Sequence, residues 1–278
     1  MNKNIDQFWQ TLPTRYPEHS DGKMIEEHYR EYHKKFGPPL GCDREYLEIG
    51  WTNYYVNNGY GKNCQELQNY LNSLDRSKKY YTIVQYDDGI VSDVSGLDIK
   101  TFACCKGDII IPVLSSPHQN VKYPEKRDIF ASFVGALGNH PIRRNMLKYL
   151  NSSDYVIKDQ KVGEADFVDT MTRSVFSLCP RGYGPTSFRM YEAIELGAIP
   201  VYIYDSYVVP HIYQLFWSDI SVGIHVSQLE YIDARLRSII SEKGRLERMQ
   251  KRLKEVRGIF TLESTCEFIH DYCSRNFK

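Results

Sequence analysis

Long apolar runs are missing from the 278-residue sequence, and so is an excess of charge of either sign. Residues 1–6 lead into no run of about 7–15 apolar residues, which a signal peptide needs, and no stretch reaches the roughly 20 that span a membrane. Basic and acidic residues number 35 each, so no net field steers the chain toward nucleic acid or an anionic membrane. We therefore expect a cytoplasmic protein with no membrane span and no nucleic-acid partner.

Metal-binding patterns are also missing. The sequence has no Asp-x-Asp element to hold a divalent ion, and no cysteine and histidine spacing typical of a zinc site. The seven cysteines are odd in number, and Cys104 and Cys105 are adjacent, which is a poor basis for a disulfide framework. We expect reduced thiols in the core, no metal site and no cofactor.

Short β-branched runs at 81–86, 108–112 and 129–135 are present instead, and they predict strands covered on both faces. The segment from 115 to 127 has turn formers and charge without an apolar period, which indicates a linker between two domains. Beyond it, predicted helices at 143–150 and 187–196 alternate with predicted strands at 175–179 and 199–204. That alternation predicts an α/β fold with a parallel sheet.

The segment 177–200 combines a strand, a glycine-containing turn, a capped helix and a second strand. Gly182 and Gly184 permit close backbone approach and unusual torsions, and Thr186 or Ser187 can cap the helix start. Gly197 supplies a left-handed residue at the helix end. The sequence therefore predicts a helix whose N-terminus begins beside an exposed turn.

Such a helix start can bind phosphate, because its backbone N–H groups are unpaired and carry partial positive charge. Arg181 and Arg189 could add forked, permanently charged donors. Glu192 lies one turn deeper, where its carboxylate could accept hydrogen bonds from both hydroxyls of a ribose. The alternative is that Arg189 and Glu192 form an ordinary i,i+3 ion pair beside an ordinary turn.

A dinucleotide-binding turn is a second interpretation of the same residues. Gly182 and Gly184 nearly match the glycine fingerprint of that turn, and Asp205 follows about twenty residues later. This interpretation predicts an NAD-dependent oxidoreductase. Against it, Ser187 replaces the third glycine and Pro185 stiffens the turn.

The segment from Cys179 to Arg189 resembles the signature of the exostosin family of inverting glycosyltransferases, family 47, and a looser resemblance covers about 80–240. The resemblance implies a GT-B architecture, in which two Rossmann-like domains with parallel sheets face each other across a cleft. Residues 1–120 would bind the acceptor and 121–255 the nucleotide sugar. Residues 256–278 would form a helix that packs back on the N-terminal domain.

The resemblance implies metal-independent transfer of a sugar from a UDP-sugar, with UDP-xylose as our guess, to a hydroxyl of an oligosaccharide or glycoprotein acceptor. Because no anchor is evident, the chain is similar to small soluble bacterial or large-virus members of the family. A viral protein of this kind would work in the host cytoplasm on capsid or surface glycans. A non-catalytic glycan-binding partner subunit is the alternative within the family.

Positive charge would stabilise the departing diphosphate in place of a metal ion. The expected donor-binding residues are Arg143, Arg144, Arg181, Gly182, Tyr183, Gly184, Thr186, Ser187, Arg189 and Glu192.

Sequence alone offers Asp87 as the first candidate for the general base and Asp88 as the second, because both follow a predicted strand; a turn-stabilising role is the alternative. The family often has a His-Asp pair at this place, and Tyr86 replaces the histidine. Trp51, Tyr54 and Tyr55 are candidates to stack against an acceptor sugar, since tyrosine, with 22 residues, is abundant.

Overall fold

The computed structural model describes residues 5–15, 17–150, 153–160, 162–212 and 215–278. Contacts divide the chain into two units, each of which is described separately below. The N-terminal unit comprises Met1–Ser116, Val209–Ile212 and Thr261–Lys278. The C-terminal unit comprises Pro117–Val208 and Tyr213–Phe260. The first division lies inside the segment from 115 to 127 that lacks an apolar period.

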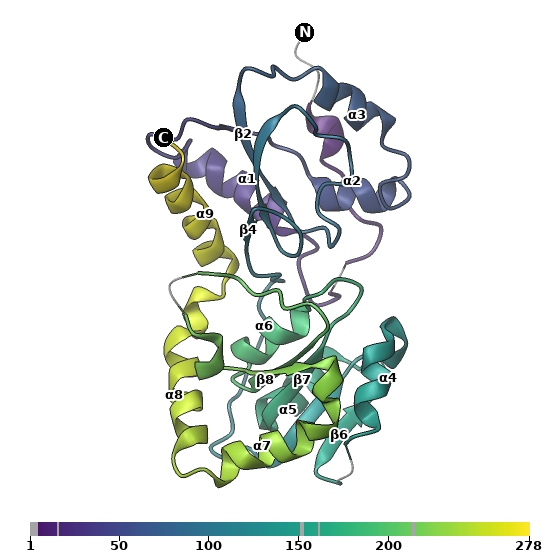
Figure 1. The fold of residues 1–278 in the computed structure, drawn as a ribbon, viewed down its shortest axis with the longest axis vertical. Helices are drawn as coiled ribbons and strands as arrows, with labels where there is room; N and C mark the ends of the chain where they lie inside the picture. The colour runs from purple at the N-terminus through teal and green to yellow at the C-terminus, as the bar shows by residue number, and fades with distance from the viewer. Residues whose placement is uncertain (1–4, 16, 151–152, 161, 213–214) are drawn as a thin grey trace. The chain divides into compact units, whose positions relative to one another are not determined.

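The N-terminal unit is built on a parallel sheet with the strand order β1-β2-β3-β4 (Figure 1). Its strands are β1 (Glu45–Tyr46), β2 (Lys79–Val84), β3 (Asp98–Ala103) and β4 (Ile109–Ile110). Its helices are the 3₁₀ helix η1 (Ile5–Phe8), α1 (Ile25–Phe36), α2 (Trp51–Asn57), α3 (Gln65–Asn72) and α9 (Leu262–Asn276). β2 is buried at every position after Lys79, because β1 and β3 flank it and helices cover it. Helix α9 packs against α1 within this unit.

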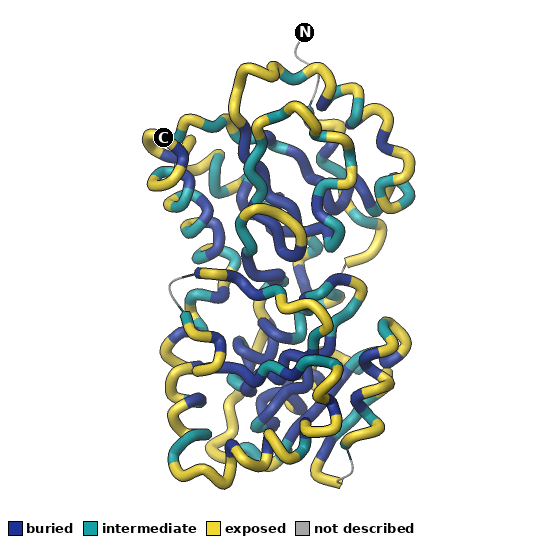
Figure 2. Tube along the Cα trace, viewed as in Figure 1, coloured by how far each residue is buried: buried dark blue, intermediate teal, exposed yellow. Residues whose placement is uncertain are grey.

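Tyrosine fills much of the core of the N-terminal unit. The hydroxyls of Tyr29 and Tyr81 hydrogen-bond to each other at 3.0 Å, and both side chains are fully buried. Trp51 and Tyr55 are 0% exposed and Tyr54 is 3% exposed, so their rings cannot stack on a sugar. The prediction that these three residues bind the acceptor is wrong, because they belong to the buried core of the N-terminal unit. Figure 2 shows the buried backbone of this unit in dark blue.

The C-terminal unit contains a five-stranded parallel sheet with the order β6-β5-β7-β8-β9. Its strands are β5 (Ile129–Val134), β6 (Tyr155–Lys158), β7 (Ser174–Pro180), β8 (Ile199–Tyr204) and β9 (Val222–His225). Its α-helices are α4 (Pro141–Leu147), α5 (Glu164–Arg173), α6 (Phe188–Glu195), α7 (Ile232–Ser241) and α8 (Arg245–Val256). Its 3₁₀ helices are η2 (Leu137–Asn139), η3 (Trp217–Asp219), η4 (Val226–Tyr231) and η5 (Arg257–Ile259).

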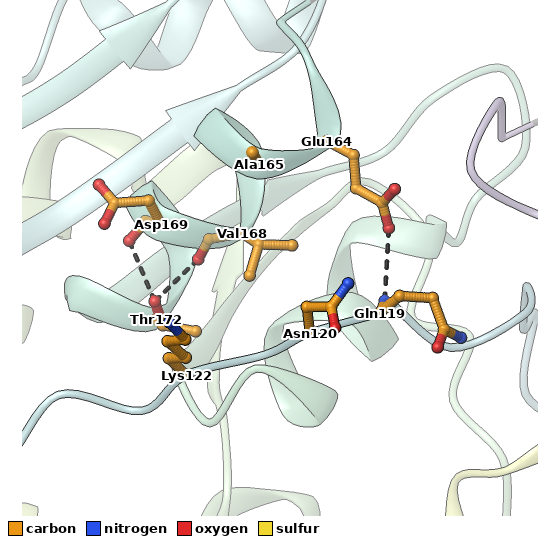
Figure 3. Close-up of a pocket in the computed structure, with 8 residues that line it drawn as sticks. All are labelled: Gln119, Asn120, Lys122, Glu164, Ala165, Val168, Asp169 and Thr172. Carbon is orange, nitrogen blue, oxygen red and sulfur yellow. Dashed lines mark hydrogen bonds between the residues drawn. The ribbon is translucent and has the colours of Figure 1, made fainter.

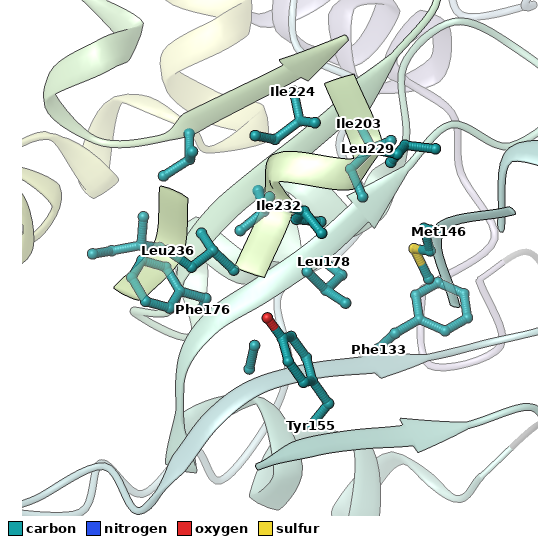
Figure 4. Close-up of a cluster of buried hydrophobic side chains, with 14 of the residues drawn as sticks. Phe133, Met146, Tyr155, Phe176, Leu178, Ile203, Ile224, Leu229, Ile232 and Leu236 are labelled. Atoms are coloured by element: carbon teal, nitrogen blue, oxygen red, sulfur yellow. The ribbon is translucent and has the colours of Figure 1, made fainter. Parts of the chain in front are cut away.

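Apolar side chains of the inner strands and of α7 form the core of this unit (Figure 4). Phe176 and Leu178 of β7 are fully buried, as is Leu236 of α7. The two parallel sheets confirm the α/β class and the parallel strands predicted for a GT-B architecture. All seven cysteines are free, as expected. Among the described residues, every helix is too short or too polar to traverse a lipid bilayer.

A partly buried carboxyl in the first turn of α1, that of Glu27, predicts how the stability of the chain depends on pH. Burial and the neighbouring Glu26 raise the pKa of Glu27 from 4.5 to about 8. Between these values the folded chain holds a proton that the unfolded chain releases, so the free energy of unfolding falls as pH rises. We expect the melting temperature to drop less between pH 5 and pH 8 in Glu27→Gln than in the wild type, as measured by calorimetry. Glu31→Gln, one turn further on at an exposed position, should keep the wild-type slope; equal slopes in Glu27→Gln and the wild type would contradict the assignment.

Candidate functional site

The strand order of the C-terminal unit indicates at which edge of the sheet a ligand should bind. The chain runs from β5 to β6 on one side of β5, and then returns to β7 on the other side. Open parallel sheets bind ligands outside the carboxyl ends of their strands at such a reversal. The loops after β5 (135–140) and after β7 (181–187) both leave from this edge, because the two strands are parallel neighbours. The predicted donor residues on these loops are therefore brought to one place.

The start of α6 is held in a defined shape. Ser187 has φ −153° and its Oγ accepts a hydrogen bond from the Arg189 N–H at 3.2 Å, so Ser187, not Thr186, is the cap. The hydroxyl of Tyr202 donates to the carbonyl of Pro185 at 2.9 Å and fixes the preceding turn. Thr186 is 5% exposed, and its Oγ1 has no hydrogen-bond partner among the described residues. A buried hydroxyl without a partner indicates that a ligand or a water completes it.

Gly182 suits this turn because it has no side chain. Its φ lies outside the left-handed region, so the predicted unusual torsion is wrong for this residue. A Cβ at Gly182 would lie 3.3 Å from Nη2 of Arg143. Close approach is therefore the reason for glycine here. Gly197, in contrast, has φ +74° directly after α6, as predicted.

Arg181 fastens the turn that precedes α6. Its Nη1 donates to both carboxylate oxygens of Asp205, at 2.7 and 2.8 Å. Its Nε and Nη2 donate to the carbonyls of Gly184 and Tyr183, at 3.2 and 2.7 Å. Burial alone would raise the pKa of Asp205, but Arg181 lowers it below its ordinary value. The carboxylate is thus engaged, which disfavours Asp205 as the ribose acceptor of a dinucleotide site.

Two further arginines connect the loops at the same edge. Arg143 is buried and donates to the carbonyls of Arg181 at 3.0 Å and Ala136 at 2.9 Å. Arg189 donates to the carbonyl of Val134, at the end of β5. These guanidinium groups hold the backbone of the site in place and concentrate positive charge there.

Arg144, by contrast, is exposed and lines a hollow of about 280 Å³. The other residues around this hollow are Leu137, Gly138, His140, Pro141 and Asn145. Of the three arginines predicted to meet the departing diphosphate, Arg144 is therefore the most accessible. The exposed Tyr183 belongs to the adjoining turn.

Glu192 is the centre of a buried charge cluster. It is 7% exposed and accepts from Nε of Arg189 at 3.1 Å, so the i,i+3 ion pair considered above is present. Nε2 of His118 lies 3.8 Å from the other carboxylate oxygen. Burial would raise the pKa of Glu192, but His118 and Arg189 hold it below its ordinary value. A buried carboxylate that stays ionised is a strong hydrogen-bond acceptor, as a ribose diol requires.

Sequence reasoning missed His118, which orients this cluster. Its Nδ1 lies 3.2 Å from a carboxylate oxygen of Glu164, and its backbone N–H donates to Glu195 at 2.7 Å. Burial alone would lower the pKa of His118, but Glu192, Glu195 and Glu164 raise it. No local pattern marks a lone histidine in a polar segment as the partner of carboxylates 46 and 77 positions away.

A hollow of about 410 Å³ adjoins this cluster within the C-terminal unit (Figure 3). Residues 119–122 form one side and α5 the other, and Glu164 accepts from the Gln119 N–H at 3.5 Å. The hollow contains none of the predicted donor-binding residues. It therefore lies outside the predicted site.

The two candidate bases of the N-terminal unit lie on the loop after β2. Oδ1 of Asp87 accepts from Sγ of Cys105 at 3.2 Å, and Oδ1 of Asp88 lies 2.6 Å from Nζ of Lys106. Gly89, with φ +70°, lets the two loops approach, since a Cβ there would lie 2.5 Å from the Lys106 carbonyl oxygen. The carboxyl ends of β2 and β3 are thus tied together, with Asp87 and Asp88 partly exposed.

Glu26 anchors the first residue of the same loop. Its Oε1 accepts from the Gln85 N–H at 3.0 Å and from the Thr52 hydroxyl at 2.6 Å. The Ile25 N–H at the start of α1 donates back to the side chain of Gln85 at 2.9 Å. Burial raises the pKa of Glu26. The helix start therefore fixes the backbone from which Asp87 projects.

Comparison with known proteins extends the resemblance found in the sequence. Residues 68–239 match the exostosin GT47 domain. The chain is 34% identical over 152 residues to a probable glucuronosyltransferase of Oryza sativa subsp. japonica, covering 48% of this chain and 35% of the relative. It is 32% identical over 158 residues to a probable beta-1,4-xylosyltransferase of Arabidopsis thaliana, covering 51% and 38%. The matched region thus spans little more than a third of the length of these relatives.

Solved structures with a similar fold are more distant. The structure of TarM matches with a TM-score of 0.45 and 7% identity, over 73% of this chain and 52% of that chain. A pneumococcal O-GlcNAc transferase, GtfA, solved with UDP and GlcNAc, matches with a TM-score of 0.39 and 12% identity, over 83% and 48%.

Proposed function

Because the chain belongs to the exostosin GT47 family, we propose that it transfers a sugar from a UDP-sugar to a hydroxyl group of a glycan, with inversion and without a metal ion. The observation that carries the proposal is the ionised, buried Glu192 one turn behind the start of α6. Next to that start lies the hydroxyl of Thr186, which has no hydrogen-bond partner among the residues that the structure describes. Together they suit a diphosphate followed by a ribose.

The donor is held in two parts. Backbone N–H groups and the partial positive charge at the start of α6 bind the diphosphate, while the Glu192 carboxylate accepts hydrogen bonds from the ribose hydroxyls. Arg144 adds an exposed charge, and Arg143 and Arg181 keep the surrounding loops rigid. This fixed positive charge stabilises the diphosphate as it leaves, in the role that a metal ion has in other transferases.

The acceptor is activated by a carboxylate. Asp87 takes the proton from the acceptor hydroxyl, whose oxygen then attacks the anomeric carbon on the face opposite the diphosphate. The new C–O bond forms as the bond to the diphosphate breaks, and UDP departs. A single displacement of this kind inverts the anomeric centre.

The names of the relatives suggest the sugar. The plant proteins described above are a probable glucuronosyltransferase and a probable xylosyltransferase, and we propose UDP-xylose as the donor with UDP-glucuronate as its competitor. An oxidoreductase is disfavoured, because the acidic residue it would use, Asp205, is bound to Arg181. The non-catalytic partner subunit remains as an outcome of the test.

Incubation with UDP-sugars should release UDP in the presence of EDTA. We expect UDP-xylose or UDP-glucuronate to give the highest rate in a UDP-release assay with xylo-oligosaccharides as acceptors. When about 5 mM Mg²⁺ replaces EDTA, each rate should change by less than about twofold, because arginine and the helix start supply the positive charge. Tight UDP binding without release from any sugar would indicate a partner subunit, and loss of the rate in EDTA would refute metal independence.

A further inference from the structure

The loop between α2 and α3 contains an unusual run of backbone conformations. Gly59, Tyr60 and Gly61 have φ angles of +67°, +58° and +84°. Glycine adopts the left-handed region freely, but a residue with a bulky side chain is strained there. Tyr60 is one of only two non-glycine residues with positive φ in the described part of the chain. Such strain persists where the surrounding structure enforces it, and it often marks a binding site.

Burial does not explain the strain at Tyr60. Its side chain is 68% exposed, whereas Tyr54 and Tyr55 on the preceding helix are buried. An exposed aromatic ring contributes little packing energy to offset an unfavourable backbone. The loop thus presents the ring to solvent at a cost to folding.

Backbone hydrogen bonds hold the loop around Tyr60 in a defined shape. The Gly61 N–H donates to the Tyr55 carbonyl at 3.0 Å, and the Asn63 N–H donates to the Asn58 carbonyl at 3.0 Å. A Cβ on Gly61 would lie 2.5 Å from Val91, so the backbone is closely packed. The exposed ring is therefore carried on a rigid turn.

The same loop is joined to the candidate base. The hydroxyl of Tyr86 donates to the carbonyl of Tyr60 at 3.4 Å, and Asp87 is the next residue along the chain. The Tyr86 ring also packs on Tyr55, with ring centroids 5.3 Å apart. Tyr60 and Asp87 thus belong to two loops that one tyrosine connects.

We propose that Tyr60 is a stacking platform for a pyranose ring of the acceptor glycan, an inference that rests on the proposed transfer to a glycan. The aromatic face contacts the C–H groups on one side of the sugar, and the phenol hydroxyl remains free to hydrogen-bond. The exposed side-chain amide of Asn63, three residues further along the same loop, offers both donors and acceptors to sugar hydroxyls. Lys62 is the one charged side chain of residues 58–63, which suits a neutral ligand. The platform replaces the buried trio of Trp51, Tyr54 and Tyr55 as the aromatic contact with the acceptor.

Substitutions at Tyr60 can separate binding from folding. Asparagine removes the ring and tolerates the left-handed region better than tyrosine, so Tyr60→Asn should fold with an unchanged or higher melting temperature. Tyr60→Trp keeps an aromatic face. Tyr231→Ala removes another exposed tyrosine, 59% accessible and located in the C-terminal unit, and is the matched control.

The experiment is a screen of the full chain on an array of plant, bacterial and animal oligosaccharides, followed by calorimetric titration of the strongest binder. We expect Tyr60→Asn to weaken that binding on the order of tenfold, while Tyr60→Trp and Tyr231→Ala stay within about threefold of the wild type. No binder on the array, equal binding by Tyr60→Asn, or a loss that accompanies a lower melting temperature would overturn the platform.

Titration with UDP distinguishes this inference from the proposed function. UDP should bind all four proteins equally, since Tyr60 lies in the N-terminal unit and Tyr231 is not among the residues of the proposed UDP site. Glycan binding that depends on Tyr60 without release of UDP from any sugar would support the platform while refuting the transfer. Release of UDP at the wild-type rate by Tyr60→Asn, at a limiting concentration of the same glycan, would refute the platform and leave the transfer intact.

Discussion

Glu192→Gln should reduce the affinity for UDP about 100-fold or more, because the amide cannot accept hydrogen bonds from both ribose hydroxyls. Each hydrogen bond to a charged group contributes about 1.5–3 kcal/mol, so the loss of one full bond and the weakening of another account for this factor. The amide also leaves Arg189 and His118 without their counter-charge. We therefore expect the free energy of unfolding to fall by about 1–3 kcal/mol. The affinity for UDP is measured by titration calorimetry at 25 °C, where the variant is still folded.

The control for this prediction lies one turn further along α6. Glu195 accepts from the backbone N–H of His118 at 2.7 Å, so it belongs to the same cluster but occupies the far end of the helix. Glu195→Gln should therefore disturb the cluster and retain UDP affinity within about threefold. If both variants lost affinity equally, the effect would come from the cluster as a whole. If neither lost affinity, the ribose assignment of Glu192 would be wrong.

The helix that carries Glu192 was predictable because its signals are local. A cap at Ser187 and a left-handed glycine at Gly197 set α6 to within a residue of the predicted range. Similarly, β8 begins and ends at the predicted residues, since it is a short run of mostly β-branched and aromatic residues that is buried at every position before Tyr204. These elements depend on chemistry within a few residues of sequence, which a single sequence displays.

Elements whose buried face is polar were missed. Helix α1 buries Glu26 and Tyr29 beside Ile25, so its inner face lacks the apolar period that predicts a helix. Strand β3 is exposed at Asp98 and only partly buried until Phe102, because it borders the two-residue β4. Burial that is set by tertiary neighbours leaves little trace in local hydropathy.

The roles of the arginines could not be predicted from residue type. From the sequence we predicted that Arg181 binds the donor phosphate, whereas in the structure its guanidinium donates hydrogen bonds to Asp205, 24 residues away. The same pairing gives Asp205 a structural partner after the glycine turn, which disfavours a role in binding a dinucleotide. A charged side chain at a site can hold the ligand or hold the loops, and only the three-dimensional partner distinguishes the two.

Asp87→Asn should lower kcat about 10²- to 10⁴-fold and leave UDP affinity unchanged, because the substitution removes the proposed general base, which is not part of the proposed donor site. Asp88→Asn is the matched control: Asp88 lies on the same loop as Asp87, and its substitution breaks an exposed ion pair with Lys106 and should retain most of the activity. Turnover is measured with the best UDP-sugar and glycan from the assays above, and UDP affinity by calorimetry. Wild-type turnover in Asp87→Asn would refute its role.

The contacts of Asp87 indicate that Asp87→Asn should lose activity without losing its folded structure. The Cys105 thiol donates to Oδ1 at 3.2 Å and so orients the carboxylate. An amide oxygen can keep the contact with the thiol, so the loop anchored by Glu26 and Gly89 should retain its shape in Asp87→Asn. A loss of rate in Asp87→Asn at an unchanged melting temperature would then indicate that the base is missing. Cys105→Ala should lose far less activity than Asp87→Asn, because the thiol orients the carboxylate but does not accept the proton.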